Sequence, residues 1–154
     1  MKKSMRKGFT LVELLITIAV MGVLSLMMIL SSAESVASAN ASNIISDMTT
    51  IKTAALAYLV DHDDEIDKAG KNFDLSKVSP DVMKYLDQST LHDNNYQLFS
   101  GWDGDECKWY VYYHNHDTKV GEKLKSRAKS VGLIKKTETQ ELYDGGDEVY
   151  LHIR

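Results

Sequence analysis

Residues 9–30 read FTLVELLITIAVMGVLSLMMIL, an apolar run of 22 residues in which Glu13 is the one charged side chain. A hydrocarbon core about 30 Å thick needs roughly 20 helical residues to cross it, so this run is long enough to span a bilayer. Residues 1–8, just before it, contain four basic side chains and no acidic one. Because a short basic flank stays on the cytoplasmic side of a membrane, the pattern predicts that the rest of the chain is translocated.

The 154-residue chain has the length of one domain, with 44% hydrophobic and 26% charged residues. Its formal charge of −4 conceals an asymmetry, because residues 9–154 hold 14 of the 18 basic side chains and all 22 acidic ones. An acidic body without a basic stretch argues against nucleic acid as the main partner. Cys107 is the single cysteine, so no intrachain disulfide can form, and we expect it to behave as a small buried apolar residue.

Three interpretations compete for residues 1–30. A secretory signal has an apolar stretch of about 7–15 residues followed by small residues, but this run is longer and Ser31-Ser32-Ala33 is a weak cleavage site. A plain signal anchor fits the length and the basic flank but does not explain Glu13. An acidic side chain at the centre of a membrane helix costs about 2.5–3.5 kcal/mol. Glu13 lies near the end of the run, where the cost is lower, yet a partner for its carboxylate is still expected.

The third interpretation rests on the sequence Lys7-Gly8-Phe9-Thr10-Leu11-Val12-Glu13-Leu14-Leu15. It resembles the processing site of type IV prepilins and their pseudopilin relatives, in which a membrane peptidase cuts after the glycine and methylates the new N-terminus. The resemblance covers about one sixth of the chain, and its register is specific. It implies a leader of residues 1–8, cleavage between Gly8 and Phe9, an N-methylated Phe9, and a role for Glu13 in subunit register and assembly.

The partner of Glu13 is open between two alternatives. Four residues along a helix place its carboxylate one turn from the Phe9 amine, on the same face. It could therefore neutralise the amine and helix N-terminus of its own chain. Alternatively, it meets the amine of a neighbouring subunit, because only a correctly seated neighbour then relieves both charges in an apolar environment. The resemblance favours the intermolecular role. Thr10 and Thr17 are assigned no function, since their hydroxyls can bond to the helix backbone.

Apolar side chains continue at helical spacing beyond the run, which predicts an amphipathic helix. They are Ile44, Met48, Ile51, Ala55 and Tyr58, with Ile45, Ala54 and Leu59 widening the stripe. Residues 9 to about 60 thus form one predicted helix of about 52 residues, about 78 Å long at 1.5 Å per residue. No small domain can bury such a helix entirely. We expect its first half to contact lipid or other helices and its second half to pack on its own head.

The remaining sequence predicts a small α+β head, with an antiparallel sheet and short helices. Ser79-Pro80-Asp81 is expected to open a helix to about Leu86, with proline at the first helical position. A second helix is expected to end near Gly132. The strand candidates are Tyr96–Ser100, Cys107–Tyr113 with Cys107, Trp109, Val111 and Tyr113 on one face, and a final strand with Val149, Leu151 and Ile153 on one face.

No catalytic constellation stands out, so the chain is not expected to be an enzyme. His114-x-His116 and the run from Asp61 to Glu65 are weak metal candidates, interpreted as a polar turn and a solvated connector. Some pseudopilins use a calcium site in this part of the fold. The acidic glycine turns Asp103–Glu106 and Asp144–Glu148 lack EF-hand spacing, however, so we expect hairpin turns and no cofactor.

These observations and the resemblance predict a structural subunit of a type IV pilus-like filament. Its parts are the leader 1–8, a transmembrane and filament-core helix 9–30, and residues 31–154 as amphipathic half-helix plus head. The expected precursor is a single-pass inner-membrane protein with its head outside the cytoplasm, which then enters a cell-surface or periplasmic filament. Expected partners are prepilin peptidase, the inner-membrane assembly platform, lipid and other pilin-like subunits. The alternatives are a pseudopilin of a type II secretion system and a membrane-anchored binding or hydrolytic domain, which would not need Gly8-Phe9 or Glu13.

Overall fold

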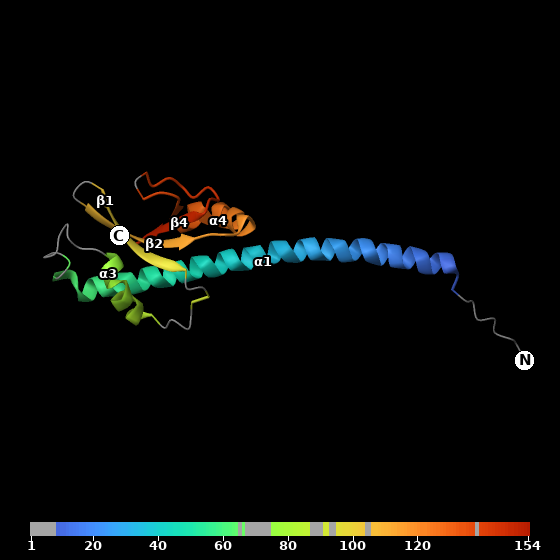
Figure 1. Cartoon of the computed structure of the whole chain (residues 1–154), viewed down its shortest axis with the longest axis horizontal. Coiled ribbons are helices and arrows are strands. Elements are labelled where there is room, and N and C mark those ends of the chain that lie inside the picture. Colours follow the sequence, from blue (N-terminus) through green and yellow to red (C-terminus); the bar gives the residue numbers. More distant parts are fainter. Residues whose placement is uncertain are drawn as a thin grey trace, which may run out of the picture. The chain divides into compact units, whose positions relative to one another are not determined.

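The computed structural model describes residues 9–64, 66, 75–86, 91–92, 95–103, 106–137 and 139–154. The predicted leader and the side chain of Cys107 lie outside this description. The chain divides into two units, Met1–Val36 and Ala37–Arg154. The elements, labelled in Figure 1 where there is room, are α1 (Leu11–Asp61), α3 (Leu75–Val82), a short 3-10 helix η2 (Met83–Tyr85), β1 (Tyr96–Asp103), β2 (Glu106–His114), α4 (Thr118–Val131), β3 (Leu133–Ile134) and β4 (Glu148–His152). The fold is α+β, as predicted.

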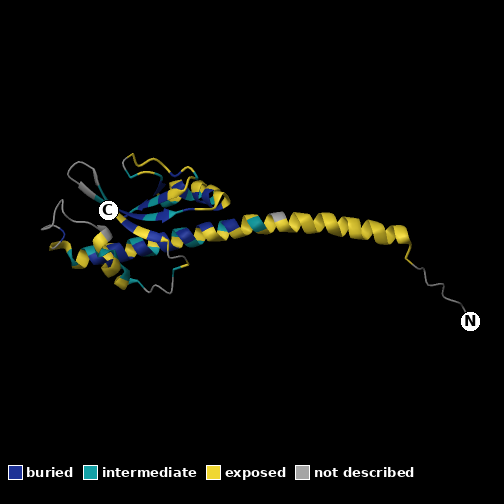
Figure 2. Ribbon diagram, viewed as in Figure 1, coloured by how far each residue is buried: buried dark blue, intermediate teal, exposed yellow. Residues whose placement is uncertain are grey.

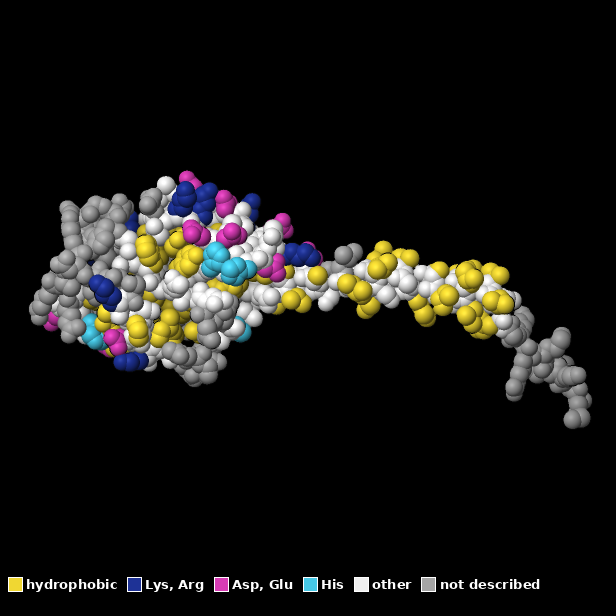
Figure 3. All heavy atoms as spheres, viewed as in Figure 1, with side chains coloured by type: hydrophobic (Ala, Val, Ile, Leu, Met, Phe, Trp, Pro, Cys, Tyr) yellow, Lys and Arg dark blue, Asp and Glu magenta, His cyan; other side chains and the backbone are white. Residues whose placement is uncertain are grey.

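The first unit consists of the beginning of α1, a helix of 51 residues that confirms the predicted long helix. Every described side chain from Phe9 to Ile29 is exposed (Figure 2), and the large apolar ones range from 52% exposed at Val20 to 84% at Leu11. Hydrophobic side chains accordingly cover this stretch in the space-filling view (Figure 3). An 18-residue window of α1 has a mean hydropathy of 2.5, so the helix is long and apolar enough to cross a membrane.

The second unit is built around the remainder of α1. The stripe predicted from helical spacing is buried there, since Ile44, Met48, Ile51, Ala55 and Tyr58 are each at most 6% exposed. These side chains belong to one hydrophobic core together with residues of the sheet and of α4. Helical residues three and four apart share a face, which explains why one stripe of α1 is enough to cover the core.

The sheet has four antiparallel strands in the order β1-β2-β4-β3. Val111 of β2 lies between Leu98 of β1 and Leu151 of β4 in the register, and all three are buried. Trp109, Val111 and Tyr113 lie in the hydrophobic core, as predicted for one face of β2. Tyr110, predicted on the opposite face, is buried as well but lies outside that core cluster. The two-residue strand β3 was not predicted, because two residues carry no readable alternation.

The boundaries of the two short helices test the predictions from capping signals. The expectation that a helix opens at Ser79 with Pro80 at its first position is wrong, because α3 begins at Leu75 and contains Pro80. Burial of Val82, four residues after the half-buried Val78, gives α3 an apolar face that outweighs the weak capping signal. The end of α4 is predicted correctly: Gly132 caps it with a φ of 82°, a left-handed conformation that favours glycine.

Polar contacts attach α4 and β4 to α1 within the second unit. The Arg127 guanidinium of α4 donates to the hydroxyl oxygens of Ser42 at 2.6 Å and Ser38 at 2.9 Å. On the sheet side, the Lys52 ammonium donates to the backbone carbonyl of His152 at 2.8 Å. These bonds join residues 85 to 100 positions apart in the chain, so they fix the helix against elements folded much later in the sequence.

We predict that Gly121→Ala destabilises the head. A Cβ atom at this buried position of α4 would lie 2.8 Å from both the Asn115 side-chain nitrogen and the Gly145 carbonyl oxygen. Overpacking of this kind costs about 1–3 kcal/mol, more than the roughly 1 kcal/mol that alanine gains over glycine in a helix. Thermal unfolding of the full chain in lipid nanodiscs, followed by near-ultraviolet circular dichroism, measures the effect. The control is Gly146→Ala, whose added Cβ meets only an ordinary contact at 3.6 Å. Equal melting temperatures for the two variants would contradict this packing account.

His152 makes the stability of the head dependent on pH. Burial, together with the nearby Lys52 and Lys108 ammonium groups, lowers the pKa of His152. The unfolded chain therefore binds a proton at a higher pH than the folded chain, so stability is lost as pH falls below about 6.5. We predict that His152→Phe loses less stability than the native chain when pH is lowered from about 7.5 to about 5.5. The same change at the exposed His116 is the control, and an identical pH dependence in all three proteins would contradict the assignment.

Candidate processing and assembly site

A capping box starts α1. The backbone N–H of Thr10 donates to Oε2 of Glu13 at 2.8 Å, and the backbone N–H of Glu13 is 3.3 Å from the Thr10 hydroxyl oxygen. The Thr10 hydroxyl also donates to Oε2 of Glu13 at 2.9 Å. The Thr10 carbonyl then accepts the first helical hydrogen bond, from Leu14 at 3.2 Å. Two N–H groups that the helix itself leaves unpaired are thus satisfied reciprocally.

This arrangement gives Thr10 a role that the sequence analysis did not assign. The signal was available, because Thr10-Leu11-Val12-Glu13 has the spacing of a capping box, a Ser or Thr followed three residues later by Glu, just before an apolar run. The partner of Glu13 within its own chain is thus three residues back, at Thr10, and not four residues back, at Phe9. In an apolar environment the box is worth more than in water, because unpaired backbone N–H groups there are costly.

Glu13 therefore has a partner within its own chain, which is Thr10 and not the Phe9 amine, and it uses only one carboxylate oxygen for it. Oε2 accepts both Thr10 hydrogen bonds, and no described residue donates to Oε1. A carboxylate oxygen can accept more than one hydrogen bond, so the capping box leaves the carboxylate able to take an additional donor. The contact of Glu13 with the amine of a neighbouring subunit remains a prediction, since a single chain contains no neighbour.

The predicted cleavage point precedes this capped helix. Gly8 lies outside the described residues, whereas Phe9 is described, lies outside regular secondary structure and is 80% exposed. The bond between Gly8 and Phe9 thus falls two residues before Leu11, the first residue of α1. A peptidase needs a segment that is not locked in helical hydrogen bonds, and Phe9, which follows the predicted bond, lies outside the helix.

The other polar side chains of the apolar stretch are satisfied locally. The hydroxyl of Thr17 donates to the Leu14 carbonyl at 2.8 Å, and that of Ser25 donates to the Met21 carbonyl at 2.8 Å. Such bonds to the preceding turn allow Ser and Thr to lie in lipid without an external partner. Glu13 alone among the described residues from Phe9 to Ile29 carries a charge there.

A buried carboxylate, Asp47, marks a polar site in the head that sequence reasoning missed. It is 2% exposed and accepts hydrogen bonds from the backbone N–H of His92 at 2.9 Å and from the Tyr96 hydroxyl at 2.9 Å. Nδ1 of His92 lies 2.8 Å from its other oxygen. These bonds hold the residues before β1 against α1, and they satisfy a charge that burial would otherwise penalise. A single Asp beside an apolar stripe carries no sequence signal for such a role.

The metal candidates from the sequence do not converge in the described part of the chain, where no three His, Cys, Asp or Glu side chains form a group able to hold an ion. His114 and His116 lie edge to face, with ring centres 4.3 Å apart. In the second acidic glycine turn, Asp144 is 3.0 Å from the Lys135 ammonium, whose hydrogen bond lowers the pKa of that carboxyl. Glu65, Gly104 and Asp105 lie outside the described residues.

Comparison with known proteins identifies the N-terminal segment. Residues 3–29 match the family model of the prokaryotic N-terminal methylation motif. No curated protein and no solved structure matches the chain. The matched stretch includes the Gly8–Phe9 bond, the capping box and most of the exposed apolar part of α1, and it supports a type IV pilin-like or pseudopilin precursor. Residues 3–29 are therefore the prepilin-type N-terminal methylation signal of this chain.

Proposed function

We propose that the chain is a structural subunit of a type IV pilus-like filament, made as a membrane precursor, cleaved after Gly8 and N-methylated at Phe9. The observation that carries the proposal is that the methylation motif coincides with a helical stretch whose described side chains are all exposed. A pseudopilin of a type II secretion system carries the same kind of signal and is the alternative. In either case the leader is residues 1–8, residues 9–30 enter lipid and then the filament core, and residues 31–154 supply the head.

The exposed apolar stretch supports assembly through α1. Burying a Leu, Ile, Val or Met side chain is worth about 1.5–3 kcal/mol, and residues 9–29 present a continuous series of them to the surroundings. Lipid covers this surface before assembly and the equivalent helices of other subunits cover it afterwards. Because lipid tails and apolar side chains are similarly hydrophobic, apolar burial alone does not select a particular register between subunits.

Glu13 is proposed to select that register. Cleavage creates an ammonium group at Phe9. Oε1 of Glu13, to which no described residue donates, accepts a hydrogen bond from the Phe9 ammonium of a neighbouring subunit. Oε2 meanwhile keeps its bonds to Thr10. In an apolar bundle both charges are relieved only when the neighbour is correctly seated. The four basic residues of the leader keep the cleavage site on the cytoplasmic side, where prepilin peptidase and the inner-membrane assembly platform would act, and the head lies outside the cytoplasm.

Processing is the first test. We predict that mature protein extracted from membranes lacks residues 1–8 and carries one methyl group on the amine of Phe9. Gly8→Leu blocks cleavage, since the peptidase recognises the small residue, whereas Gly22→Leu, a matched change in open space within α1, leaves cleavage intact. Intact-mass spectrometry checks each chain. A mass corresponding to cleavage near Ala33, or an uncleaved native chain in the presence of an active prepilin peptidase, would contradict the proposal.

The role of Glu13 is the second test. We predict that Glu13→Ala is inserted and cleaved normally but is largely absent from sheared filaments, because breaking a buried charge pair from one side costs about 3–5 kcal/mol. Glu13→Gln retains the shape and should give an intermediate yield. Immunoblots of membranes and of sheared filaments measure both steps.

Thr10→Val separates capping from register, because it removes the capping hydroxyl and keeps the Glu13 carboxylate. We expect a filament yield close to that of the native chain. An equal loss of filaments in Thr10→Val and Glu13→Ala would assign Glu13 to helix capping alone. A normal filament yield from Glu13→Ala would leave apolar packing as the only source of assembly specificity.

A further inference from the structure

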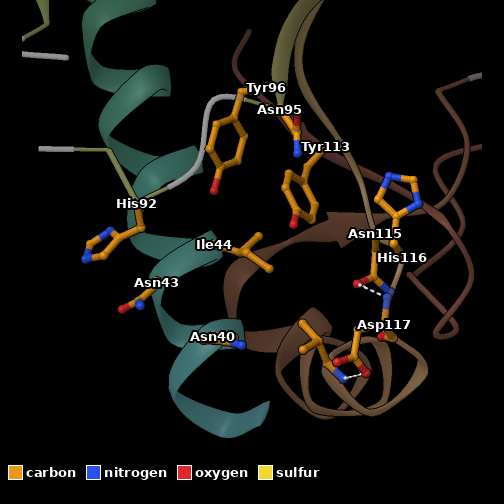
Figure 4. A pocket seen from close by; sticks show the side chains of 11 residues that line it. Asn40, Asn43, Ile44, His92, Asn95, Tyr96, Tyr113, Asn115, His116 and Asp117 are labelled. Carbon is orange, nitrogen blue, oxygen red and sulfur yellow. Dashed lines mark hydrogen bonds between the residues drawn. The ribbon is translucent and has the colours of Figure 1, made fainter. Parts of the chain in front are cut away.

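The head contains a cavity of about 320 Å³, a volume within the roughly 300–1,000 Å³ typical of small-molecule sites. It lies between α1, the residues before β1, the end of β2 and the start of α4, all within the unit Ala37–Arg154 (Figure 4). The side chains lining it are Asn40, Asn43, Ile44, His92, Asn95, Tyr96, Tyr113, Asn115, His116, Asp117 and Val120.

The cavity has a buried floor and a polar rim. Ile44, Tyr96, Tyr113 and Val120 are each at most 8% exposed, and the two tyrosine rings are tilted against each other with centres 5.1 Å apart. Figure 4 shows Asn40 and Asn43 on the α1 side and Asn115, His116 and Asp117 on the opposite side, with Ile44 and the Tyr113 ring between them. A lining that combines apolar and aromatic surface with several polar groups is the usual composition of a ligand site.

The floor is held rigidly by internal hydrogen bonds. Tyr96 donates to the buried Asp47, which also fixes His92 at the rim through Nδ1. The buried Asn115 is fixed by a bond from its side-chain nitrogen to the Asp117 carbonyl at 3.1 Å and by its side-chain oxygen, which accepts from the Asp117 N–H at 3.3 Å. A cavity whose walls are fixed before binding loses little entropy when a ligand enters.

The charges at the rim narrow the class of ligand. No Lys or Arg is among the described residues that line the cavity, so none of them supplies the ammonium or guanidinium group that usually binds a phosphate or a carboxylate. Asp117 is the one carboxylate in the lining, and its Oδ1 accepts from the backbone N–H groups of Lys119 and Val120 as the cap of α4. A single carboxylate is far fewer oxygen ligands than a bound divalent cation takes. The rim is also too polar for a lipid chain.

Amide and imidazole groups dominate what remains. An Asn side chain offers both donors and an acceptor, and an imidazole nitrogen that is not already bonded adds one more, so together they match hydroxyl groups, which also donate and accept. Asn40 and Asn43 stand one turn apart on the same face of α1 and can engage adjacent hydroxyls. The apolar floor suits the C–H face of a sugar ring. We propose that this cavity binds a neutral sugar residue, a role that does not depend on the filament function proposed above.

Saturation-transfer difference NMR on the full chain in phospholipid nanodiscs tests the proposal, since alkyl glycoside detergents would themselves present sugars. The probes are glucose, galactose and N-acetylglucosamine, with glucose 6-phosphate as the anionic comparison. We expect saturable binding of at least one neutral sugar, with a Kd in the millimolar range, and weaker binding of the phosphate. The double variant Asn40→Ala/Asn43→Ala should raise the Kd of the bound sugar at least about fivefold, the effect of losing about 1 kcal/mol of hydrogen bonding.

The double variant should fold, because alanine favours a helix more than asparagine does and neither side chain is buried. Gln97→Ala, which removes an exposed amide from β1 away from the cavity, is the matched control and should bind as the native chain does. Absence of saturable binding by every neutral probe overturns the proposal. So does equal binding by the double variant, an equal loss in Gln97→Ala, or a preference for glucose 6-phosphate over glucose.

Discussion

The described residues at the start of α1, from Phe9 to Ile29, are all exposed, although most are strongly apolar. Water cannot be their permanent neighbour, because this much apolar surface on a soluble monomer would drive association. The cover must come from lipid or from other chains, and the helix provides continuous, unbranched surface for both. Beyond its first turn its backbone is paired within the helix, so it can pass from one apolar environment to the other without exposing an unsatisfied N–H or C=O group there. The hydroxyls of Thr17 and Ser25 likewise donate to backbone carbonyls of the preceding turn.

The capping box satisfies backbone N–H groups at the start of α1, but it also places a carboxylate in apolar surroundings. Thr10 and Glu13 satisfy N–H groups at the start of α1, where the apolar surroundings offer no water. The carboxylate that does so is charged, and a charge in that environment needs a cation. In the precursor the helix N-terminus itself supplies a positive field beside the carboxylate. In the proposed function, removal of the leader creates an ammonium group at Phe9, which the Glu13 carboxylate of another subunit accepts. Helix capping is observed for Glu13 and subunit register is proposed for it, and Thr10→Val and Glu13→Ala separate the two roles.

Periodicity predicted the parts of the fold in which many residues repeat one signal. The stripe from Ile44 to Tyr58, the alternation through Val111 and the glycine cap at Gly132 all appear in the structure. Capping signals predicted less well, because α3 begins four residues before Ser79 and accommodates Pro80 in its interior. The polar cluster around Asp47 could not be predicted, since its donors lie more than forty residues away in the chain and only the fold brings them together. The cavity lining is scattered in the same way, whereas the methylation signal is contiguous and was therefore readable from the sequence alone.

The central claim, that the first half of α1 is covered by lipid and then by other subunits, is open to one direct measurement. In a Cys107→Ser background, single cysteines at Ile16 and at the exposed Ser130 of α4 can be labelled with a membrane-impermeant maleimide, in membranes and in sheared filaments. The account predicts that Ser130→Cys reacts readily in both preparations. Ile16→Cys should react in neither until detergent or denaturant is added. Rapid labelling of Ile16→Cys in intact membranes or filaments, at the rate of Ser130→Cys, would contradict the claim.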